Sequence, residues 1–397
     1  MGKTLREIAQ QLSTPKTVKK TVPEKTKVIE EIKPVPKVQL IYAFNGTGKT
    51  RLSRELKQLI SPRLDEREVD DGMDKFDPSR NKVLYYNAFT EDLFFWDNDL
   101  AGDAEPKLRI QPNSYTDWLL VLLKDLGQDG NIAKYFQRYT SDKLTPHFSE
   151  NFAEVSFSIE RGNNERSEHI KISKGEESNF IWSVFYTLLD QVVAILNVPE
   201  SDDRETRQFD QLEYIFIDDP VSSLDDNHLI ELAVNLAGLI RSSQSDLKFV
   251  ITTHSPLFYN VLFNELNNKI CYMLEGLQDG TFALTEKLGD SNKSFSYHLH
   301  LKQTIEQAIA EGRVERYHFT LLRNLYEKTA SFLGYPRWSE LLPDDKSLYL
   351  SRVINFTSHS TLSNETIAEP KPEEKAMVKL LLDHLQNTYG FWKQEGA

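Results

Sequence analysis

The stretch that decides the fold is "LIYAFNGTGKTRLSREL", residues 40–56. An apolar run enters a loop with two glycines, and a lysine and a threonine follow directly. This pattern is typical of a strand, a phosphate-binding loop and a helix, because glycine lets backbone N–H groups approach a phosphate closely. We therefore expect a nucleotide site here, formed by Asn45, Gly46, Thr47, Gly48, Lys49, Thr50 and Arg51.

One position departs from the usual pattern of such a loop. Ala43 stands where the first glycine is expected, which matters only if that position needs a positive φ. Lys49 would contact the β- and γ-phosphates, and Thr50 would bind Mg²⁺. The alternative interpretation is a plain glycine-rich turn.

Three further segments follow in a fixed order. They are "ISKGEE" at 172–177, "YIFIDDPVSSLDD" at 214–226 and "ITTHSP" at 251–256. In this order they resemble the signature, Walker B with D-loop, and H-loop of ATP-binding-cassette (ABC) ATPases. The resemblance implies nucleotide contacts from Ser173, Gly175 and Glu176, Mg²⁺ held through water by Asp218, an attacking water oriented by Asp219, and a γ-phosphate contact from His254.

The chain departs from the cassette ATPase pattern at two positions. Asp219 stands where most cassette ATPases carry Glu, so slow, switch-like hydrolysis is the hypothesis. The glutamine of the Q-loop is missing, and Asn87 is a candidate substitute. Asp218 and Asp219 could instead cap a helix or turn after a strand. Since the signature of one cassette subunit closes over the phosphates of another, a head-to-tail homodimer or higher homo-oligomer is implied.

The composition limits the classes of protein that the chain can represent. A net charge of -13 disfavours broad electrostatic binding to nucleic acid, so such a ligand would need a local site. Cys271 is the single cysteine and gives no support to an oxidising compartment. Residues 180–196 are apolar but contain Ser, Thr, Asp and Gln, which indicates a core helix. We expect a cytoplasmic protein without a membrane segment.

The order of apolar patterns predicts three regions. Residues 1–37 read as a basic, partly disordered arm. Residues 38–264 read as an α/β domain, an ABC-type P-loop NTPase with a mixed sheet, although residues 107–160 follow no clear pattern. Residues 265–397 begin with a hairpin signal and then become helix-periodic, which predicts a mainly helical C-terminal domain.

The C-terminal region contains three residues suited to metal-free RNA cleavage. Arg323 and Glu327 share one helical face, and His359 lies in a polar segment. His and Glu can act as general base and acid, while Arg stabilises charge on the phosphate. A surface ion pair and a turn histidine are the alternative readings. The scattered His and Asp residues give no zinc spacing, so we expect no metal for this step.

Over its whole length the chain resembles the bacterial anticodon nucleases, from "MGKTLREIAQQLSTPKTVKK" through "KLGDSNKSFSYHLHLKQTIEQAIA" to the end. The resemblance implies a cassette NTPase that controls a C-terminal ribonuclease with Arg323, Glu327 and His359 as its catalytic set. The substrate would be lysine tRNA, cut in the anticodon loop 5' to the wobble base, leaving a 2',3'-cyclic phosphate and a 5'-OH.

The same resemblance implies regulation and partners. An associated type I DNA restriction-modification complex would keep the nuclease silent, and a phage-encoded peptide that disables this complex would release it. Mg²⁺ with GTP or ATP would serve the NTPase domain, with GTP hydrolysis as the trigger, and a thymidine nucleotide would hold the active form. Asp290 matches the family segment that reads the wobble base.

Two other interpretations of the C-terminal third stay open. It also resembles HEPN ribonuclease domains, in which an Arg precedes a His, so Arg352 is a second-choice catalytic residue and is otherwise a surface arginine. The rival function is an ABC-type DNA-repair or DNA-sensing ATPase whose C-terminal third only docks to a partner. The Arg323, Glu327 and His359 set discriminates between them, because a docking module would not need it.

Overall fold

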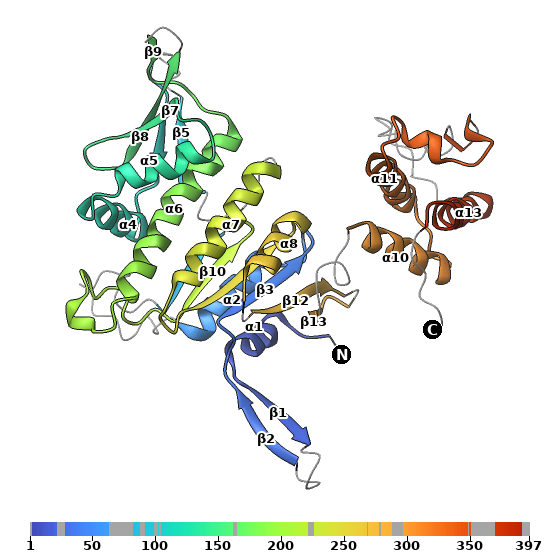
Figure 1. Cartoon of the computed structure of the whole chain (residues 1–397), viewed down its shortest axis with the longest axis horizontal. Coiled ribbons are helices and arrows are strands. Elements are labelled where there is room, and N and C mark those ends of the chain that lie inside the picture. Colours follow the sequence, from blue (N-terminus) through green and yellow to red (C-terminus); the bar gives the residue numbers. More distant parts are fainter. Residues whose placement is uncertain are drawn as a thin grey trace. The chain divides into compact units, whose positions relative to one another are not determined.

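The computed structural model of the chain divides into two compact units, Met1–Gly289 and Asp290–Ala397 (Figure 1). The first unit carries the glycine loop, and the second carries the Arg323 and Glu327 pair. The structure describes residues 2–21, 28–62, 82–87, 92–98, 102, 105–161, 165–220, 226–267, 269–277, 279–287, 297–347, 349–350 and 370–390.

The centre of the first unit is a six-stranded sheet (Figure 1). Its strands are β3 (Val38–Ala43), β4 (Val83–Tyr86), β10 (Tyr214–Asp218), β11 (Lys248–Thr253), β12 (Lys269–Gly276) and β13 (Phe282–Lys287). The order is β13-β12-β3-β11-β10-β4, with β13 antiparallel to β12 and the other pairs parallel. The predicted α/β class with a mixed sheet is therefore confirmed.

The register of the central strands places polar residues together at one edge. Asp218 is the partner of Thr252, and Thr252 is the partner of Ile41. The loop that follows Ala43 leaves the sheet at this same edge, because parallel strands end on the same side. Strands β3 and β10 are buried along their whole length, as expected for parallel strands covered on both faces.

One face of the sheet is covered by two helices from the N-terminal part of the chain. Helix α2 (Lys49–Ile60) and helix α1 (Leu5–Ser13) place apolar side chains in one core cluster with Ile41 and Ala43 of β3. Residues at alternate positions of a strand point to opposite faces, which assigns α1 and α2 to the face of Ile41.

Helices α6 (Lys174–Leu196), α7 (Asp226–Ser242) and α8 (Pro256–Glu265) cover the opposite face (Figure 1). The ring of Tyr42 on β3 lies 5.8 Å from that of Tyr259 on α8, and the ring of Tyr86 on β4 lies 4.9 Å from Phe185 on α6. Helix α6 is long and apolar enough to cross a membrane by length and composition alone, yet 83% of its apolar window is buried inside the protein. It is a core helix, as predicted.

The start of the chain differs from the predicted arm over residues 1–37. Helix α1 begins after Thr4, whose side chain and Glu7 cap each other reciprocally, and it buries Leu5, Ile8, Ala9 and Leu12. These apolar residues recur at helical spacing and pack into the core of the first unit. Strands β1 (Lys16–Thr21) and β2 (Val28–Lys33) then form an antiparallel pair. Residues 2–13 are therefore part of the folded domain.

Residues 107–160, which follow no clear sequence pattern, form most of a second sheet. It contains β5 (Phe94–Asp97), β6 (Lys107–Ile110), β7 (Leu144–Phe148), β8 (Glu154–Arg161) and β9 (Glu165–Ser167), all paired antiparallel. Helices α4 (Ser114–Asp125) and α5 (Asp129–Arg138) lie between its strands in sequence, and a short 3-10 helix, η3 (Ser201–Asp203), follows α6. The ring centres of Phe157 on β8 and Phe180 on α6 lie 5.2 Å apart, so this sheet packs against α6.

The boundary between the two units lies later than the predicted one at residue 265. Strand β12 pairs in parallel with β3, and β13 pairs with β12, so both belong to the sheet of the first unit. The sequence predicts two strands here, and both are present. Local pattern does not show that the first of them pairs with β3, which lies far away in the sequence. The first unit accordingly extends to Gly289.

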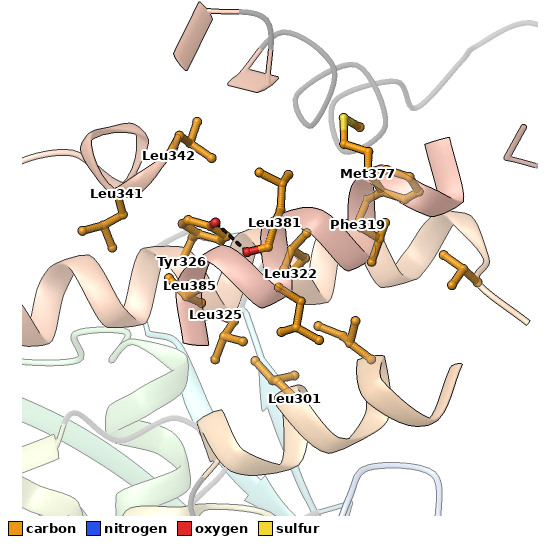
Figure 2. Packing of buried hydrophobic residues seen from close by; sticks show 14 of the residues in the cluster. Leu301, Phe319, Leu322, Leu325, Tyr326, Leu341, Leu342, Met377, Leu381 and Leu385 are labelled. Atoms are coloured by element: carbon orange, nitrogen blue, oxygen red, sulfur yellow. Dashed lines mark hydrogen bonds between the residues drawn. The ribbon is translucent and has the colours of Figure 1, made fainter. Parts of the chain in front are cut away.

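The second unit is mainly helical, as predicted. It contains α10 (Tyr297–Ala310), α11 (Arg316–Leu333), the 3-10 helix η4 (Trp338–Leu341) and α13 (Pro372–Thr388). Figure 2 shows its core, in which Leu322 and Leu325 of α11 meet Leu381 and Leu385 of α13. The buried hydroxyl of Tyr326 donates to the carbonyl oxygen of Leu381 at 2.8 Å, which joins α11 to α13.

Candidate functional site

The loop between β3 and α2 has the backbone of a phosphate-binding loop. Gly46 and Gly48 have φ of 81° and 88°, values that other residues rarely adopt. Ala43 is the last residue of β3 and has no positive φ, so the missing first glycine costs no backbone strain. Thr47 donates its hydroxyl to the carbonyl oxygen of Phe44 at 2.6 Å and fixes the turn.

Lys49 starts α2 and lies at the centre of this loop. Its Nζ is 3.3 Å from the carbonyl oxygens of Ala43 and Phe44 and from Oδ1 of Asn45. The side chain is only 8% exposed, so its charge is held close to the loop. The N-terminal end of α2 has no side-chain cap, which leaves its first N–H groups directed toward the loop. This arrangement favours an anion.

Asp218 lies at the end of β10 beside the first turn of α2. Its two carboxylate oxygens accept hydrogen bonds from the hydroxyls of Thr50 and Thr252, both at 2.5 Å. Burial raises the pKa of the Asp218 carboxyl above its usual value, against the opposing effect of these hydrogen bonds. A carboxylate and a hydroxyl that meet here fit Mg²⁺, which prefers hard oxygen ligands.

Asp219 follows in a left-handed conformation, with a φ of 53°. This turn directs its carboxylate to Lys49, 3.4 Å away, and to Nδ1 of His254. Thr253 and the backbone N–H of His254 also donate to Asp219, at 3.2 and 3.3 Å. Burial raises the pKa of Asp219, but the hydrogen bond from His254 and the charges of His254 and Lys49 outweigh it, so the pKa lies below its usual value.

The signature residues lie at the start of α6. Ser173 is exposed and caps the helix: its hydroxyl accepts from the N–H of Glu176 at 3.3 Å, and its own N–H donates to Glu176 at 2.7 Å. Gly175 lies in the first turn. An exposed helix start with a small residue in its first turn can approach an anion closely.

Four contacts in the candidate site are not evident from the sequence pattern. Thr252 and Thr253 donate hydrogen bonds to Asp218 and Asp219. Both threonines directly precede His254 in "TTHSP", so the sequence offered a sign of this role. Leu5 of α1 lies close to the loop, since a Cβ added to Gly48 would meet its side chain at 3.2 Å. Arg51 lies 5.6 Å from the ring of Phe282 on β13. The contacts of Leu5 and Arg51 join segments that are distant in the sequence, so local pattern does not predict them.

In the second unit, Arg323 and Glu327 form an ion pair on α11. Nε of Arg323 donates to Oε1 of Glu327 at 2.8 Å, and the side chains are 35% and 41% exposed. The one-face placement expected from their spacing is therefore present. Asp290, Arg352 and His359 lie outside the described residues.

Within the described parts of the chain, no group of three or more His, Cys, Asp or Glu side chains is arranged to hold a metal ion. Cys271 is buried, and burial raises the pKa of its thiol. The predicted Mg²⁺ position at Thr50 and Asp218 has one carboxylate and one hydroxyl, so most of its ligands would be water and phosphate.

A phosphate-binding loop after β3, an acidic pair at the end of β10 and a histidine after β11 define a P-loop NTPase domain of the ABC type. The chain is 77% identical to the anticodon nuclease of Escherichia coli over 395 residues, which covers 100% of this chain and 99% of the relative. The chain belongs to the anticodon nuclease family. No model of a protein family matches it.

Solved structures similar to the chain include an SMC head domain and the RNase-L inhibitor. The SMC head domain from Thermotoga maritima is 11% identical, with a TM-score of 0.28, over 70% of this chain and 100% of that one. The RNase-L inhibitor is 14% identical, with a TM-score of 0.32, over 66% of this chain and 42% of that one.

Proposed function

We propose that the chain is a nucleotide-activated endoribonuclease that cuts lysine tRNA in the anticodon loop, 5' to the wobble base. One observation carries this proposal: an arginine and a glutamate are joined on the partly exposed side of α11 in a chain of the anticodon nuclease family. A helical docking module would not need this pair at the surface.

The chemistry follows from what the catalytic side chains can do. The 2'-OH attacks the adjacent phosphorus while His359 and Glu327 supply the base that takes its proton and the acid that protonates the leaving 5' oxygen. Arg323 stabilises the charge that grows on the phosphate, for which its planar guanidinium is suited. The products are a 2',3'-cyclic phosphate and a 5'-OH. Arg352 is the second-choice arginine, and Asp290 reads the wobble base.

The nucleotide site controls this nuclease. Asn45, Gly46, Thr47, Gly48, Lys49, Thr50 and Arg51 hold the phosphates of GTP or ATP, and Thr50 and Asp218 hold the accompanying Mg²⁺. Asp219 orients water and His254 contacts the γ-phosphate. The hydrogen bonds from His254 and Thr253 hold the Asp219 carboxylate toward Lys49, which supports this arrangement. Hydrolysis of GTP triggers cleavage, and a thymidine nucleotide holds the active form.

The partners complete the proposal. Ser173, Gly175 and Glu176 of one subunit close over the phosphates of another, in a head-to-tail homodimer or higher oligomer. A type I DNA restriction-modification complex keeps the cytoplasmic protein silent, and a phage-encoded peptide releases it in anti-phage defence. The exposed position of Ser173 at the start of α6 supports its contact with another subunit.

One experiment tests the reaction. Full-length protein is incubated with Mg²⁺, GTP and lysine tRNA, and with the same tRNA carrying a single 2'-deoxy nucleotide directly 5' to the scissile phosphate. We expect cleavage of the first and none of the second, because the nucleophile is gone. Cleavage of the deoxy tRNA at the same bond, or 3'-OH ends, would point to a metal-dependent nuclease. Intact tRNA with an ATPase stimulated by DNA would support the rival DNA-sensing function.

A further inference from the structure

Arg323 has an aromatic neighbour in addition to Glu327. Its guanidinium carbon lies 5.8 Å from the centre of the indole ring of Trp338, within the range of a cation–π interaction. Trp338 starts η4, which follows α11 along the chain. The guanidinium is therefore contacted by a carboxylate through Nε and by the face of an aromatic ring.

Trp338 is itself held in place by the core of the second unit. Helix α11 ends at Leu333, and the following Gly334, with a φ of 79°, turns the chain so that η4 packs against α11. The indole packs edge-on to Tyr326, with ring centres 6.2 Å apart, and Tyr326 is fixed to α13 through Leu381 (Figure 2). Leu341, at the other end of η4, is fully buried. The ring thus has a rigid support.

The contacts with Glu327 and Trp338 both restrict the motion of the Arg323 side chain. The Arg323 side chain is 35% exposed, and a long exposed arginine loses considerable rotamer freedom when it is fixed. A catalytic group must be held close to its productive geometry, and packing around it is what supplies this. The hydrogen bond to Glu327 fixes only one edge of the guanidinium. The indole ring of Trp338 also restricts the orientation of the guanidinium plane.

We propose that Trp338 is a positioning residue that fixes the guanidinium of Arg323 for contact with the scissile phosphate of RNA. This inference rests on the proposed function, because it needs Arg323 to act on the phosphate. It assigns to the segment after α11 a role in the reaction rather than only in packing. Stacking of the indole on an RNA base is the competing role, and it makes a different kinetic prediction.

The test compares Trp338→Leu and Trp338→Phe in the full-length, nucleotide-activated protein on an anticodon stem–loop of lysine tRNA. We expect Trp338→Leu to lower the rate at saturating RNA roughly 10- to 100-fold, with little change in half-saturating RNA concentration. Trp338→Phe should recover most of the rate because it keeps an aromatic face. An unchanged rate in Trp338→Leu, or a raised half-saturating concentration at an unchanged rate, would overturn the proposal.

Leu342→Ala is the matched control for loss of packing. Leu342 follows η4 and is 4% exposed in the same core, and no contact joins it to Arg323 among those the structure gives for the described residues. Its replacement should lower Tm at least as much as Trp338→Leu while the rate, measured well below Tm, stays near wild type. A comparable loss of rate in Leu342→Ala would mean that Trp338 acts through packing alone.

The double variant separates positioning from an independent role. Trp338→Leu should have no further effect in an Arg323→Ala background, whereas a further loss by the same factor would contradict action through Arg323. Arg323→Ala also distinguishes the two proposals. A wild-type rate in Arg323→Ala would contradict the catalytic assignment itself, while a slow Arg323→Ala together with a fast Trp338→Leu would contradict only the role of Trp338.

Discussion

Nζ of Lys49 lies 3.4 Å from Oδ2 of Asp219, so the phosphate-loop lysine and the aspartate that directly follows β10 form an ion pair. Both side chains are largely buried, at 8% and 18% exposure. The γ-phosphate of a nucleotide would compete with Asp219 for this ammonium. His254 also contacts Asp219, so the carboxylate keeps a partner when Lys49 turns to phosphate. The ion pair therefore connects the candidate phosphate-binding loop with the residues that we propose act in hydrolysis.

Lys49→Ala should remove nucleotide-dependent activation while the chain still folds. Loss of one charge-assisted contact to phosphate should weaken nucleotide binding roughly 10- to 100-fold. Titration with a fluorescent GTP analogue measures the affinity, and tRNA cleavage measures activation. Lys57→Ala is the control, because Lys57 is on the same helix but lies 4.4 Å from the ring of Tyr85 rather than in the loop. A wild-type nucleotide response in Lys49→Ala would mean that the site is assigned wrongly.

Asp218→Asn should stabilise the protein and abolish its Mg²⁺-nucleotide response. Burial raises the folded-state pKa of Asp218, so the ionised carboxylate destabilises the fold at neutral pH. This loss of folding stability becomes smaller as the pH falls from the raised pKa toward the ordinary pKa of 3.8, because the carboxyl becomes protonated. The amide removes this cost, and we expect Tm at pH 7 to rise.

The pH dependence of this effect is a second readout for Asp218. The gain in Tm from Asp218→Asn should be largest at neutral pH and should shrink as the solution is acidified below the folded-state pKa. Asp202→Asn is the control, because the side chain of Asp202 is 86% exposed and its replacement should leave Tm nearly unchanged at every pH. A lower Tm for Asp218→Asn at pH 7 would show that its hydrogen bonds outweigh its burial.

The sequence predicted those parts of the fold that local pattern determines. The run from residue 38 to 60 became a strand, a loop and a helix because apolar period, glycines and helix propensity all agree there. Residues 107–160 could not be assigned, since the antiparallel strands β7 and β8 are stabilised by pairing with each other and by α6. Helix α1 was also missed, although its cap and its apolar spacing are both readable in the sequence.

The positions of the candidate site residues in the fold were predictable to a similar extent. The order of motifs brought Thr50, Asp218, Asp219 and His254 to one edge of the sheet, because each motif follows a parallel strand. The hydroxyls of Thr252 and Thr253, and the contact of Trp338 with Arg323, depend on how side chains turn once the elements have packed. Such contacts have no fixed spacing in sequence, so pattern alone could not supply them.

Ser173→Asp should block nucleotide-dependent dimerisation without destabilising α6. Aspartate is as good a helix cap as serine, so the hydrogen bond to the N–H of Glu176 should survive. Its negative charge, however, would oppose the phosphates that a second subunit presents to this helix start. Light scattering with a slowly hydrolysed GTP analogue should show dimers for the wild type and for Ser173→Asn, a neutral cap, but monomers for Ser173→Asp. Dimers for all three proteins would remove Ser173 from the interface.

Glu327→Gln separates proton transfer from support of Arg323. The amide oxygen of glutamine can still accept the hydrogen bond that Nε of Arg323 donates at 2.8 Å, so the guanidinium should stay in place. Glutamine cannot exchange a proton, and the cleavage rate should therefore fall roughly 10²- to 10⁴-fold if Glu327 is the acid or the base. Rates on lysine tRNA are compared with those of Lys328→Gln, the adjacent residue on α11 and outside the proposed set. A rate near wild type for Glu327→Gln would limit Glu327 to holding Arg323, and His359 would then need another partner for the second proton transfer.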